Sequence, residues 1–374
     1  MKKELAETLL AKIMGWTDAE KATERARLES FATYKYDQYQ QFSPGRRFME
    51  SLALWLGQFD EGPERRTAYD FVTRRLVFIS GDEMNNLVGL TFPTIIRPRL
   101  IRDAAAELQL RPERVKAVLA TPEYRARLRR TLVLGLSDGA RTDQFRRANP
   151  QDISNEQVFH AYDVSAAKAD NLVKKLRKEL RGVLGREPTA GEARFQYVVL
   201  LDDFSASGTS AIRRDSQSET GWDGKIPRII EELERDDNLG SAIAASDVRV
   251  MVVVYVASGQ AIEHIGGLLS DLSFSKGSIE FHVVHRLCSS TRLDDAGDAG
   301  VLSLANQDRY FDASVDDEHA AVGGTSKRLG YAGGRLPVVL GHNTPNNSIF
   351  LLWAEDIQGV RGLFPRVSRH RKRQ

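Results

Sequence analysis

Cysteine is nearly absent from this sequence, since Cys288 is the only one in 374 residues. A single cysteine forms no disulfide within the chain and gives no cysteine-based zinc site. The seven histidines do not compensate, because His282 and His285 lie three apart on an expected strand and so face opposite sides. The sequence therefore predicts neither a disulfide-stapled domain nor a zinc protein.

Long apolar segments are missing as well. The longest run, residues 248–257, is too short to cross a bilayer, and Glu4 and Glu7 interrupt the pattern of a secretory signal. A Walker A sequence is absent, and no Gly-x-Gly-x-x-Gly turn follows a strand. With 41% hydrophobic and 28% charged residues, we expect a globular protein of the cytoplasm with no membrane partner.

The net charge of +2 hides an uneven distribution. Residues 361–374 hold six basic side chains and no acidic one, and the remaining chain has a slight excess of acid. Such a basic tail has two interpretations that the sequence leaves open. It contacts nucleic acid or an acidic partner, or it is a solubilising end of the chain.

The most informative segment is residues 197–210, which read YVVLLDDFSASGTS. Residues 197–201 are apolar on both faces, which is typical of a central strand in a parallel sheet. Asp202 and Asp203 follow at its carboxyl end, where open α/β sheets bind ligands, and we expect both carboxylates to face solvent or ligand. The next residues have little side-chain bulk, so their amides can surround a phosphate, helped by a following helix dipole. Hydroxyl donors come from Ser207, Thr209 and Ser210.

A second candidate turn follows the apolar strand expected at residues 131–136. It consists of Ser137, Asp138, Gly139, Ala140 and Arg141. Gly139 allows unusual backbone torsions, the Ser137 hydroxyl can donate, and Arg141 can bind a phosphate through two parallel hydrogen bonds. Either this is a phosphate-binding turn or it is a polar surface turn.

A third candidate is the loop of residues 341–347, which reads GHNTPNN between two expected strands. The side-chain amides of Asn343 and Asn346 can read the edge of a base or a ribose hydroxyl. Asn and Pro are also favoured in turns for backbone reasons alone, so a plain polar turn is the alternative.

The predicted secondary structure changes near residue 130. Residues 1–130 read as helices, with a capping box at Ser80 to Glu83. They form a winged-helix-like DNA-binding unit, a partner-binding unit, or a plain helical bundle that packs on the α/β domain. Residues 131–360 alternate between strands and helices, which predicts an α/β domain with a parallel sheet, and residues 361–374 form the basic tail. Within the α/β domain we expect a helix over 154–180, a long loop over 294–328 and strands at 248–257, 279–287, 336–340 and 348–353.

Residues 197–210 resemble the phosphoribosyl-pyrophosphate (PRPP) motif of type I phosphoribosyltransferases, in which a hydrophobic strand, two acids and a short Ser/Thr/Gly loop follow one another. The resemblance implies that Asp202 and Asp203 are the catalytic pair, bind the ribose hydroxyls and through them a Mg²⁺ ion. It implies that residues 137–141 hold the pyrophosphate. The 5′-phosphate would be bound by Ser205, Ala206, Ser207, Gly208, Thr209 and Ser210.

The chain is also similar to phosphoribosyltransferase-like effectors of bacterial conflict systems, some of which accompany retron reverse transcriptases. The similarity rests on the segments 80–84, 138–141, 202–210 and 342–347. It implies an effector of anti-phage defence that binds PRPP or a nucleotide and transfers or cleaves the ribosyl-phosphate group. The partners expected are nucleic acid, a defence-system protein or a second copy of the chain.

Two departures from the transferase pattern leave an alternative open. Many transferases carry an acid where this chain has Ala206, so no general base is defined, and residues 211–224 look like an insertion where a helix should start. A helical DNA-binding unit joined to such a domain is also the layout of Gram-positive purine repressors, which sense PRPP and bind DNA. The sequence does not separate a catalyst from such a sensor, because binding and catalysis use the same loop.

Overall fold

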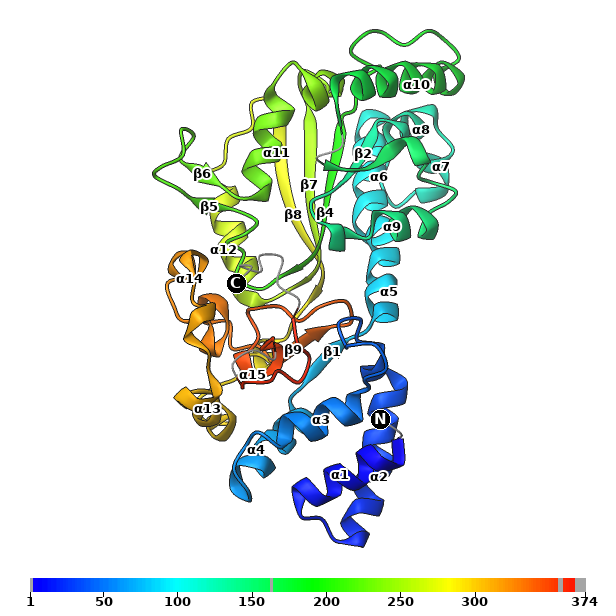
Figure 1. The fold of residues 1–374 in the computed structure, drawn as a ribbon. Helices are drawn as coiled ribbons and strands as arrows, with labels where there is room; N and C mark the ends of the chain where they lie inside the picture. The colour runs from blue at the N-terminus through cyan, green and yellow to red at the C-terminus, as the bar shows by residue number, and fades with distance from the viewer. Residues whose placement is uncertain (1–2, 162–163, 356–358, 367–374) are drawn as a thin grey trace. The chain divides into compact units, whose positions relative to one another are not determined.

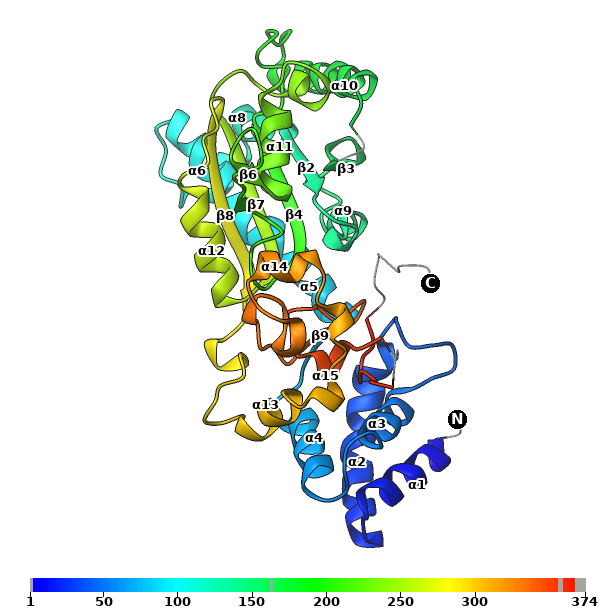
Figure 2. The ribbon, with the colours of Figure 1, turned by 60° about the vertical axis from the view of Figure 1, so that its left-hand side comes forward.

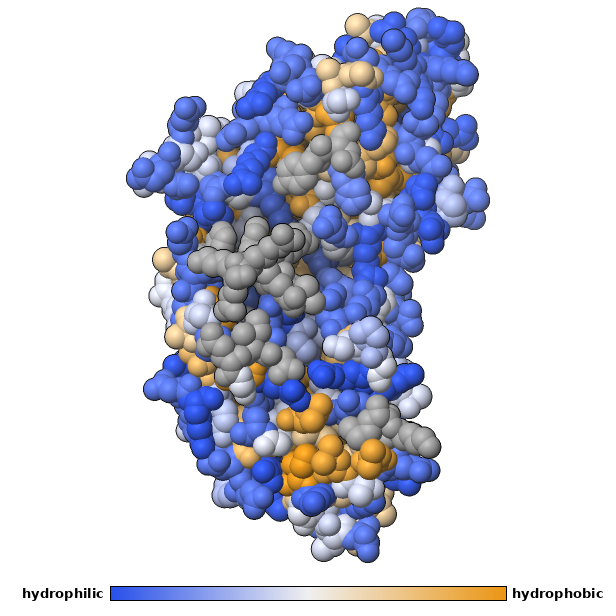
Figure 3. Space-filling model, in the orientation of Figure 1, coloured by the Kyte–Doolittle hydropathy of each residue, from blue (hydrophilic) through white to orange (hydrophobic). Residues whose placement is uncertain are grey.

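The computed structural model describes residues 3–161, 164–355 and 359–366 (Figure 1). The chain forms two compact units, each considered by itself below. The terminal unit combines residues 1–84 with residues 288–374, and the sheet unit is the continuous stretch 85–287. No helix among the described residues is long and apolar enough to cross a bilayer. The face shown in Figure 3 is largely hydrophilic, with apolar areas on both the sheet unit and the terminal unit.

The sheet unit is built on a five-stranded sheet in the order β3-β2-β4-β7-β8, and every neighbouring pair is parallel. The strands are β2 (Thr131–Gly135), β3 (Val158–His160), β4 (Tyr197–Ser205), β7 (Val248–Ala257) and β8 (Gly277–Arg286). The predicted α/β parallel sheet is therefore confirmed, with the apolar run of residues 197–201 in its central strand. β4 continues beyond that run, so that Asp202 and Asp203 lie in the strand and not after it.

Helices lie on both faces of this sheet (Figure 2). The helices of the unit are α5 (Gly81–Thr91), which starts in the terminal unit, α6 (Arg97–Glu107), α7 (Val115–Leu119), α8 (Pro122–Arg129), α9 (Thr142–Ala148), α10 (Ala166–Leu184), α11 (Lys225–Glu234) and α12 (Gly259–Leu269). Val198 and Leu200 of β4 share one apolar core with α10, α11 and α12. Because side chains alternate along a strand, Tyr197 points to the opposite face, where α6 lies.

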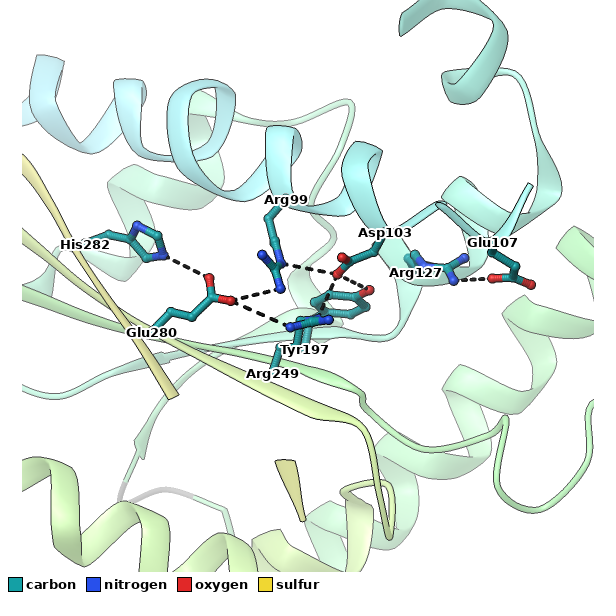
Figure 4. Close-up of polar contacts among 8 residues, drawn as sticks. All are labelled: Arg99, Asp103, Glu107, Arg127, Tyr197, Arg249, Glu280 and His282. Atoms are coloured by element: carbon teal, nitrogen blue, oxygen red, sulfur yellow. Dashed lines mark hydrogen bonds and ion pairs between the residues drawn. The ribbon is translucent and has the colours of Figure 1, made fainter. Parts of the chain in front are cut away.

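Charged side chains attach α6 to the amino ends of the strands (Figure 4). Asp103 of α6 accepts a hydrogen bond from the Tyr197 hydroxyl at 2.9 Å and pairs with the Arg249 guanidinium at 2.9 Å. Arg99, one turn earlier, pairs with Glu280 of β8 at 2.9 Å. The network thus spans β4, β7 and β8 at the end of the sheet opposite to the carboxyl ends of the strands.

Asp103 holds this network together, and its replacement should destabilise the fold. In Asp103→Ala, Arg99 and Arg249 lose a shared partner in a largely buried place, so we expect a loss of about 2–3 kcal/mol in the free energy of unfolding, measured in urea. Glu107→Ala is the matched control on the same helix. Glu107 is 54% exposed where it pairs with Arg127, so its loss should cost less than about 1 kcal/mol. Equal losses in the two variants would contradict the anchoring role of Asp103.

The terminal unit joins the two ends of the chain in one core. Its elements are α1 (Lys3–Met14), α2 (Asp18–Tyr34), α3 (Phe48–Leu56), α4 (Pro63–Arg74), β1 (Val77–Ile79), α13 (Ala299–Ala305), α14 (Glu318–Gly323), β9 (Val338–Leu340) and α15 (Phe350–Trp353). The ring of Phe364 stacks on Phe48 with a centroid distance of 5.9 Å, and the Trp55 indole donates to the Leu351 carbonyl at 2.8 Å. The units therefore do not follow the expected boundaries at residues 130 and 360, because residues after 288 complete the core of the first helices.

The capping box before α5 is confirmed, since the Ser80 hydroxyl accepts from the Glu83 amide and the Glu83 carboxylate accepts from the Ser80 amide. The helical character of the N-terminal region is confirmed too. The strand pair in this unit does not fit a winged helix, however. β1 pairs with β9 in parallel, whereas the wing of that fold is an antiparallel hairpin.

Several expected elements differ from the structure. Residues 348–353 are not a strand, because α15 occupies Phe350–Trp353. The expected loop over 294–328 contains α13 and α14. The expected helix over 154–180 contains a 3-10 turn and the short strand β3 before α10 begins at Ala166. In the basic tail, Leu363 and Phe364 are fully buried, while residues 367–374 lie outside the described part of the chain.

Candidate functional site

The connections of the sheet define where a ligand can bind. From β2 the chain moves outward to β3 on one side, and from β4 it moves outward to β7 on the other. The topological switch point therefore lies between the carboxyl ends of β2 and β4, the place where open α/β sheets bind ligands. Residues 137–141 follow β2, and residues 202–210 lie at the end of β4. The structure thus brings two of the three predicted segments together.

The two aspartates at the end of β4 are in unequal surroundings. Asp202 is only 6% exposed, and its carboxylate accepts hydrogen bonds from the Ser137 hydroxyl at 2.5 Å and the Lys225 ammonium at 2.6 Å. Asp203 is half-buried, and its Oδ1 lies 3.5 Å from the same Ser137 hydroxyl. Asp202 therefore does not face solvent, and both of its oxygens have protein partners. A direct role of Asp202 toward a ligand stays a prediction.

Burial has the strongest influence on the Asp202 carboxyl group and raises its pKa above the ordinary value. The positive charge of Lys225 acts in the opposite direction, and the negative charge of Asp203 adds to the increase. Lys225 thus favours the ionised form of Asp202 against the effects of burial and of Asp203.

Removal of Lys225 should make stability depend on pH. Without the ammonium group the pKa of Asp202 in the folded state rises further. A carboxyl group with a raised folded pKa keeps its stabilising contribution below the unfolded pKa and loses it as the pH increases through the folded pKa. We therefore expect Lys225→Met to match the wild type near pH 4 and to be less stable by about 2–3 kcal/mol at about pH 7, as measured by urea unfolding. Lys225→Arg keeps the charge and should show no such dependence; an equal deficit of Lys225→Met at both pH values would contradict the explanation.

The loop after β4 has the features of an anion site. Within the described part of the chain, the amides of Ser207, Gly208 and Ser210 donate to no protein acceptor. Gly208 has φ +80°, and a Cβ there would lie 2.8 Å from the His264 ring, so the backbone packs directly on α12. The Ser258 hydroxyl donates to the Ala206 carbonyl and fixes the start of the loop. Unpaired amides on an immobilised backbone are what a phosphate group needs.

The insertion after the loop folds as a small antiparallel hairpin, β5 (Arg213–Arg214) with β6 (Trp222–Asp223), before α11 begins. Despite this insertion, α11 starts directly beside the loop. The amides of Lys225 and Ile226 donate to the carbonyls of Ser210 and Ala211, and Pro227 has no amide hydrogen. The first amides of α11 are thus used within the protein, and the expected helix-dipole contribution does not include a free N–H group for the ligand.

Gly139 is needed for a different reason than the one expected. A Cβ at Gly139 would lie 2.3 Å from the Asp203 carboxylate, so only glycine lets the turn approach this side chain. The left-handed backbone conformation belongs to Arg141 instead, at φ +49°. The Arg141 guanidinium donates to the Asn85 side-chain oxygen of α5 at 2.8 Å, and this hydrogen bond orients the arginine side chain toward α5.

Two residues of the site were missed from the sequence. Tyr255 of β7 is fully buried, and its hydroxyl donates to the Ala140 carbonyl at 2.6 Å, so it supports the 137–141 turn from below. The signal was present, because a tyrosine inside an apolar strand needs a hydrogen-bond partner. Lys225 is the second, and its signal was a cation in the first turn of a helix, where the dipole disfavours it.

The third predicted segment belongs to the terminal unit. The Asn343 side-chain oxygen accepts a hydrogen bond from the adjacent Thr344 amide at 3.0 Å, which is a typical backbone role of asparagine in a turn. Thr344 is itself fully buried and donates to the Phe364 carbonyl. A ligand-binding role of Asn343 and Asn346 stays a prediction.

The acidic side chains do not fit a resident metal ion. Among the residues that the structure describes, no group of three or more His, Cys, Asp or Glu side chains is arranged to hold one. Asp202, the most buried acid of the site, already binds Lys225 and Ser137. A Mg²⁺ ion carried by the ligand itself stays a prediction.

Comparison with protein families gives one match, and the PRTase-CE family model covers residues 52–366. This range includes the whole sheet unit and most of the terminal unit. No curated protein and no solved structure matches the chain.

Proposed function

Since the chain belongs to the PRTase-CE family of phosphoribosyltransferase-like proteins, we propose that it binds a ribose 5-phosphate compound, PRPP or a nucleotide, between β2 and β4. The observation that carries the proposal is the loop of residues 205–210. Within the described residues, its Ser207, Gly208 and Ser210 amides donate to no protein acceptor, and they lie at the switch point of the sheet shortly after two aspartates. The 5′-phosphate occupies this loop, and the ribose hydroxyls donate to Asp203, the more exposed of the two acids.

The reaction that fits this arrangement takes place at C1 of the ribose. The bond from C1 to the pyrophosphate oxygen or to the base nitrogen breaks, and its electron pair leaves with that group. A base or a water molecule then supplies an electron pair to C1 and loses a proton. The protein contributes by holding the sugar in place and by positioning negative charge near a C1 centre that becomes positive. Residues 137–141, supported by Tyr255, hold the departing group.

The similarity of residues 80–84, 138–141 and 342–347 to bacterial conflict effectors supports a biological role in anti-phage defence. In that setting, transfer or cleavage of ribosyl-phosphate groups alters the nucleotide supply of an infected cell.

Calorimetric titration with PRPP tests the binding, and mass spectrometry of products from PRPP with a nucleotide mixture tests the reaction. Binding in the micromolar to millimolar range together with a new ribosyl-phosphate product would support the proposal. Folded protein that binds neither PRPP nor any nucleotide up to millimolar concentration would refute it.

One observation favours a second candidate, a PRPP-sensing regulator that does not turn its ligand over. Ala206 is buried, and its carbonyl accepts the Ser258 hydroxyl, so this position brings no acid to the reacting ring. A salt-dependent DNA affinity that PRPP weakens, with no product formed, would favour the regulator. Product formation without DNA affinity would exclude it.

A further inference from the structure

The Lys225 side chain lies against Asp202, beside the acidic pair. We propose that its ammonium group is the resident cation of the site, so that a ligand with a single phosphate on its ribose binds without a metal. This inference rests on the proposed function, and it names the ligand class: ribose 5-monophosphates, including nucleoside monophosphates.

The first step of the argument is the need for a cation. Asp202 and Asp203 are adjacent, and one hydroxyl, that of Ser137, lies within 3.5 Å of both carboxylates. Two carboxylates so close together repel each other, and burial removes the water that would screen them. Either a proton or a cation must compensate for the second charge.

The second step is that Lys225 meets this need and is held in place. Its Nζ donates to Asp202 at 2.6 Å, and its own amide donates to the Ser210 carbonyl of the phosphate loop. The preceding Gly224 has φ +123°, and a Cβ there would lie 2.6 Å from the Ala211 carbonyl oxygen. Only glycine allows this approach, which ties the start of α11 to the loop and places the lysine between loop and acids.

The third step is that the neighbouring arginines have other partners. Arg141 donates to Asn85, and Arg213 pairs with Asp223 of the hairpin. Of these three cations, Lys225 is the one that pairs with the buried acid, and 29% of its side chain remains exposed.

A divalent ion can have two roles with ribose phosphates: it can compensate charge at the acidic pair, and it can bind to a pyrophosphate group. Lys225 fulfils the first role, so a monophosphate needs no ion. A diphosphate ligand such as PRPP still brings an ion on its own pyrophosphate. Whether binding requires a metal ion should therefore depend on the ligand: a monophosphate needs none, and a diphosphate does.

Calorimetry with ribose 5-phosphate, with Mg²⁺ or with EDTA, tests this directly. The wild type should give dissociation constants that agree within about twofold in the two buffers. Lys225→Met should bind at least about tenfold more weakly in EDTA and should recover part of the loss with Mg²⁺. Strict metal dependence of the wild type, or full affinity of Lys225→Met in EDTA, would overturn the inference.

A second measurement needs no sugar, and so it separates this inference from the proposed function. Titration with Mn²⁺, followed by electron paramagnetic resonance, should show no binding to the wild type at submillimolar concentration and clear binding to Lys225→Met. If ribose 5-phosphate binds to neither protein, the proposed function fails, while the Mn²⁺ result still decides the role of Lys225. Absence of Mn²⁺ binding by the folded variant would show that Lys225 is only a structural partner of Asp202.

Matched variants control for the loss of any positive charge on α11 and for misfolding of Lys225→Met. Arg228→Met removes a cation from the same helix, one turn later, where it pairs with Asp223, and should behave as the wild type in both assays. Lys225→Arg keeps the charge and should also bind ribose 5-phosphate without a metal. If Lys225→Met does not fold, the double variant Asp202→Asn with Lys225→Met removes both charges, and it should fold and bind no Mn²⁺; Mn²⁺ binding by it would contradict the inference.

Discussion

Replacement of both Asp202 and Asp203 by asparagine should abolish ribose-phosphate binding and activity while the protein stays folded. Asp203 is the acceptor that we assign to the ribose hydroxyls, and charged hydrogen bonds of this kind contribute enough that the loss should exceed about a hundredfold in affinity. Asparagine at position 202 can keep its one oxygen as the acceptor for Lys225 and donate from its NH2 group to the Ser137 hydroxyl oxygen, so the unfolding free energy should change by less than about 2 kcal/mol. Calorimetry with ribose 5-phosphate and urea unfolding measure the two effects.

Asp271→Asn is the control for the acid replacement, because Asp271 is more than half exposed and pairs with Arg214 away from the strand ends. It should leave both binding and stability unchanged. Full binding by the double variant would show that the sugar is not held by these aspartates. Loss of the folded state would instead show that their role is structural.

A valine at position 208 should remove phosphate binding by distorting the loop. Gly208 has a left-handed conformation, and an added Cβ would come within 2.8 Å of His264 and 3.0 Å of Ile265. A β-branched residue is strained in this conformation, so we expect a loss of about 2–4 kcal/mol in stability. The misplaced amides should reduce affinity for ribose 5-phosphate by more than about a hundredfold.

Gly266→Ala serves as the comparison, since Gly266 lies on α12 near the same contact and a Cβ there meets nothing within 4 Å. Alanine favours the helix and should raise stability by about 0.5–1 kcal/mol without any effect on binding. Wild-type affinity in Gly208→Val would mean that the loop does not bind the phosphate.

The central strand and its loop could be predicted from the sequence because their signals are local. The apolar run of residues 197–201 predicts a buried strand, and the residues that follow are small and polar over a few positions. β7 occupies the ten residues that its apolar run predicted, Val248–Ala257. Such patterns depend on neighbours in the chain, and the fold does not override them here.

The partners of the site could not be predicted in the same way. Lys225 meets Asp202 across 23 residues of sequence, and the approach depends on how the hairpin of residues 213–223 folds back. Trp55 and Leu351 are 296 residues apart in the sequence, so no local sequence pattern predicts that they share the core of the terminal unit. Residues 348–353 were wrongly expected to form a strand, because an apolar run of this length fits a strand or a short buried helix equally well.

The shared core of the two chain ends has a consequence for biosynthesis. The sheet unit is one continuous stretch and can fold as soon as it has left the ribosome. The first helices instead wait for Leu351, Leu352, Leu363 and Phe364, which complete their core. Until Phe364 arrives, the rings of Tyr36, Phe48 and Phe78 lack a neighbour that each of them contacts in the finished protein. A nascent or prematurely terminated chain should therefore expose aromatic surface at its N-terminus and become a substrate for chaperones and proteases, so that only complete copies accumulate.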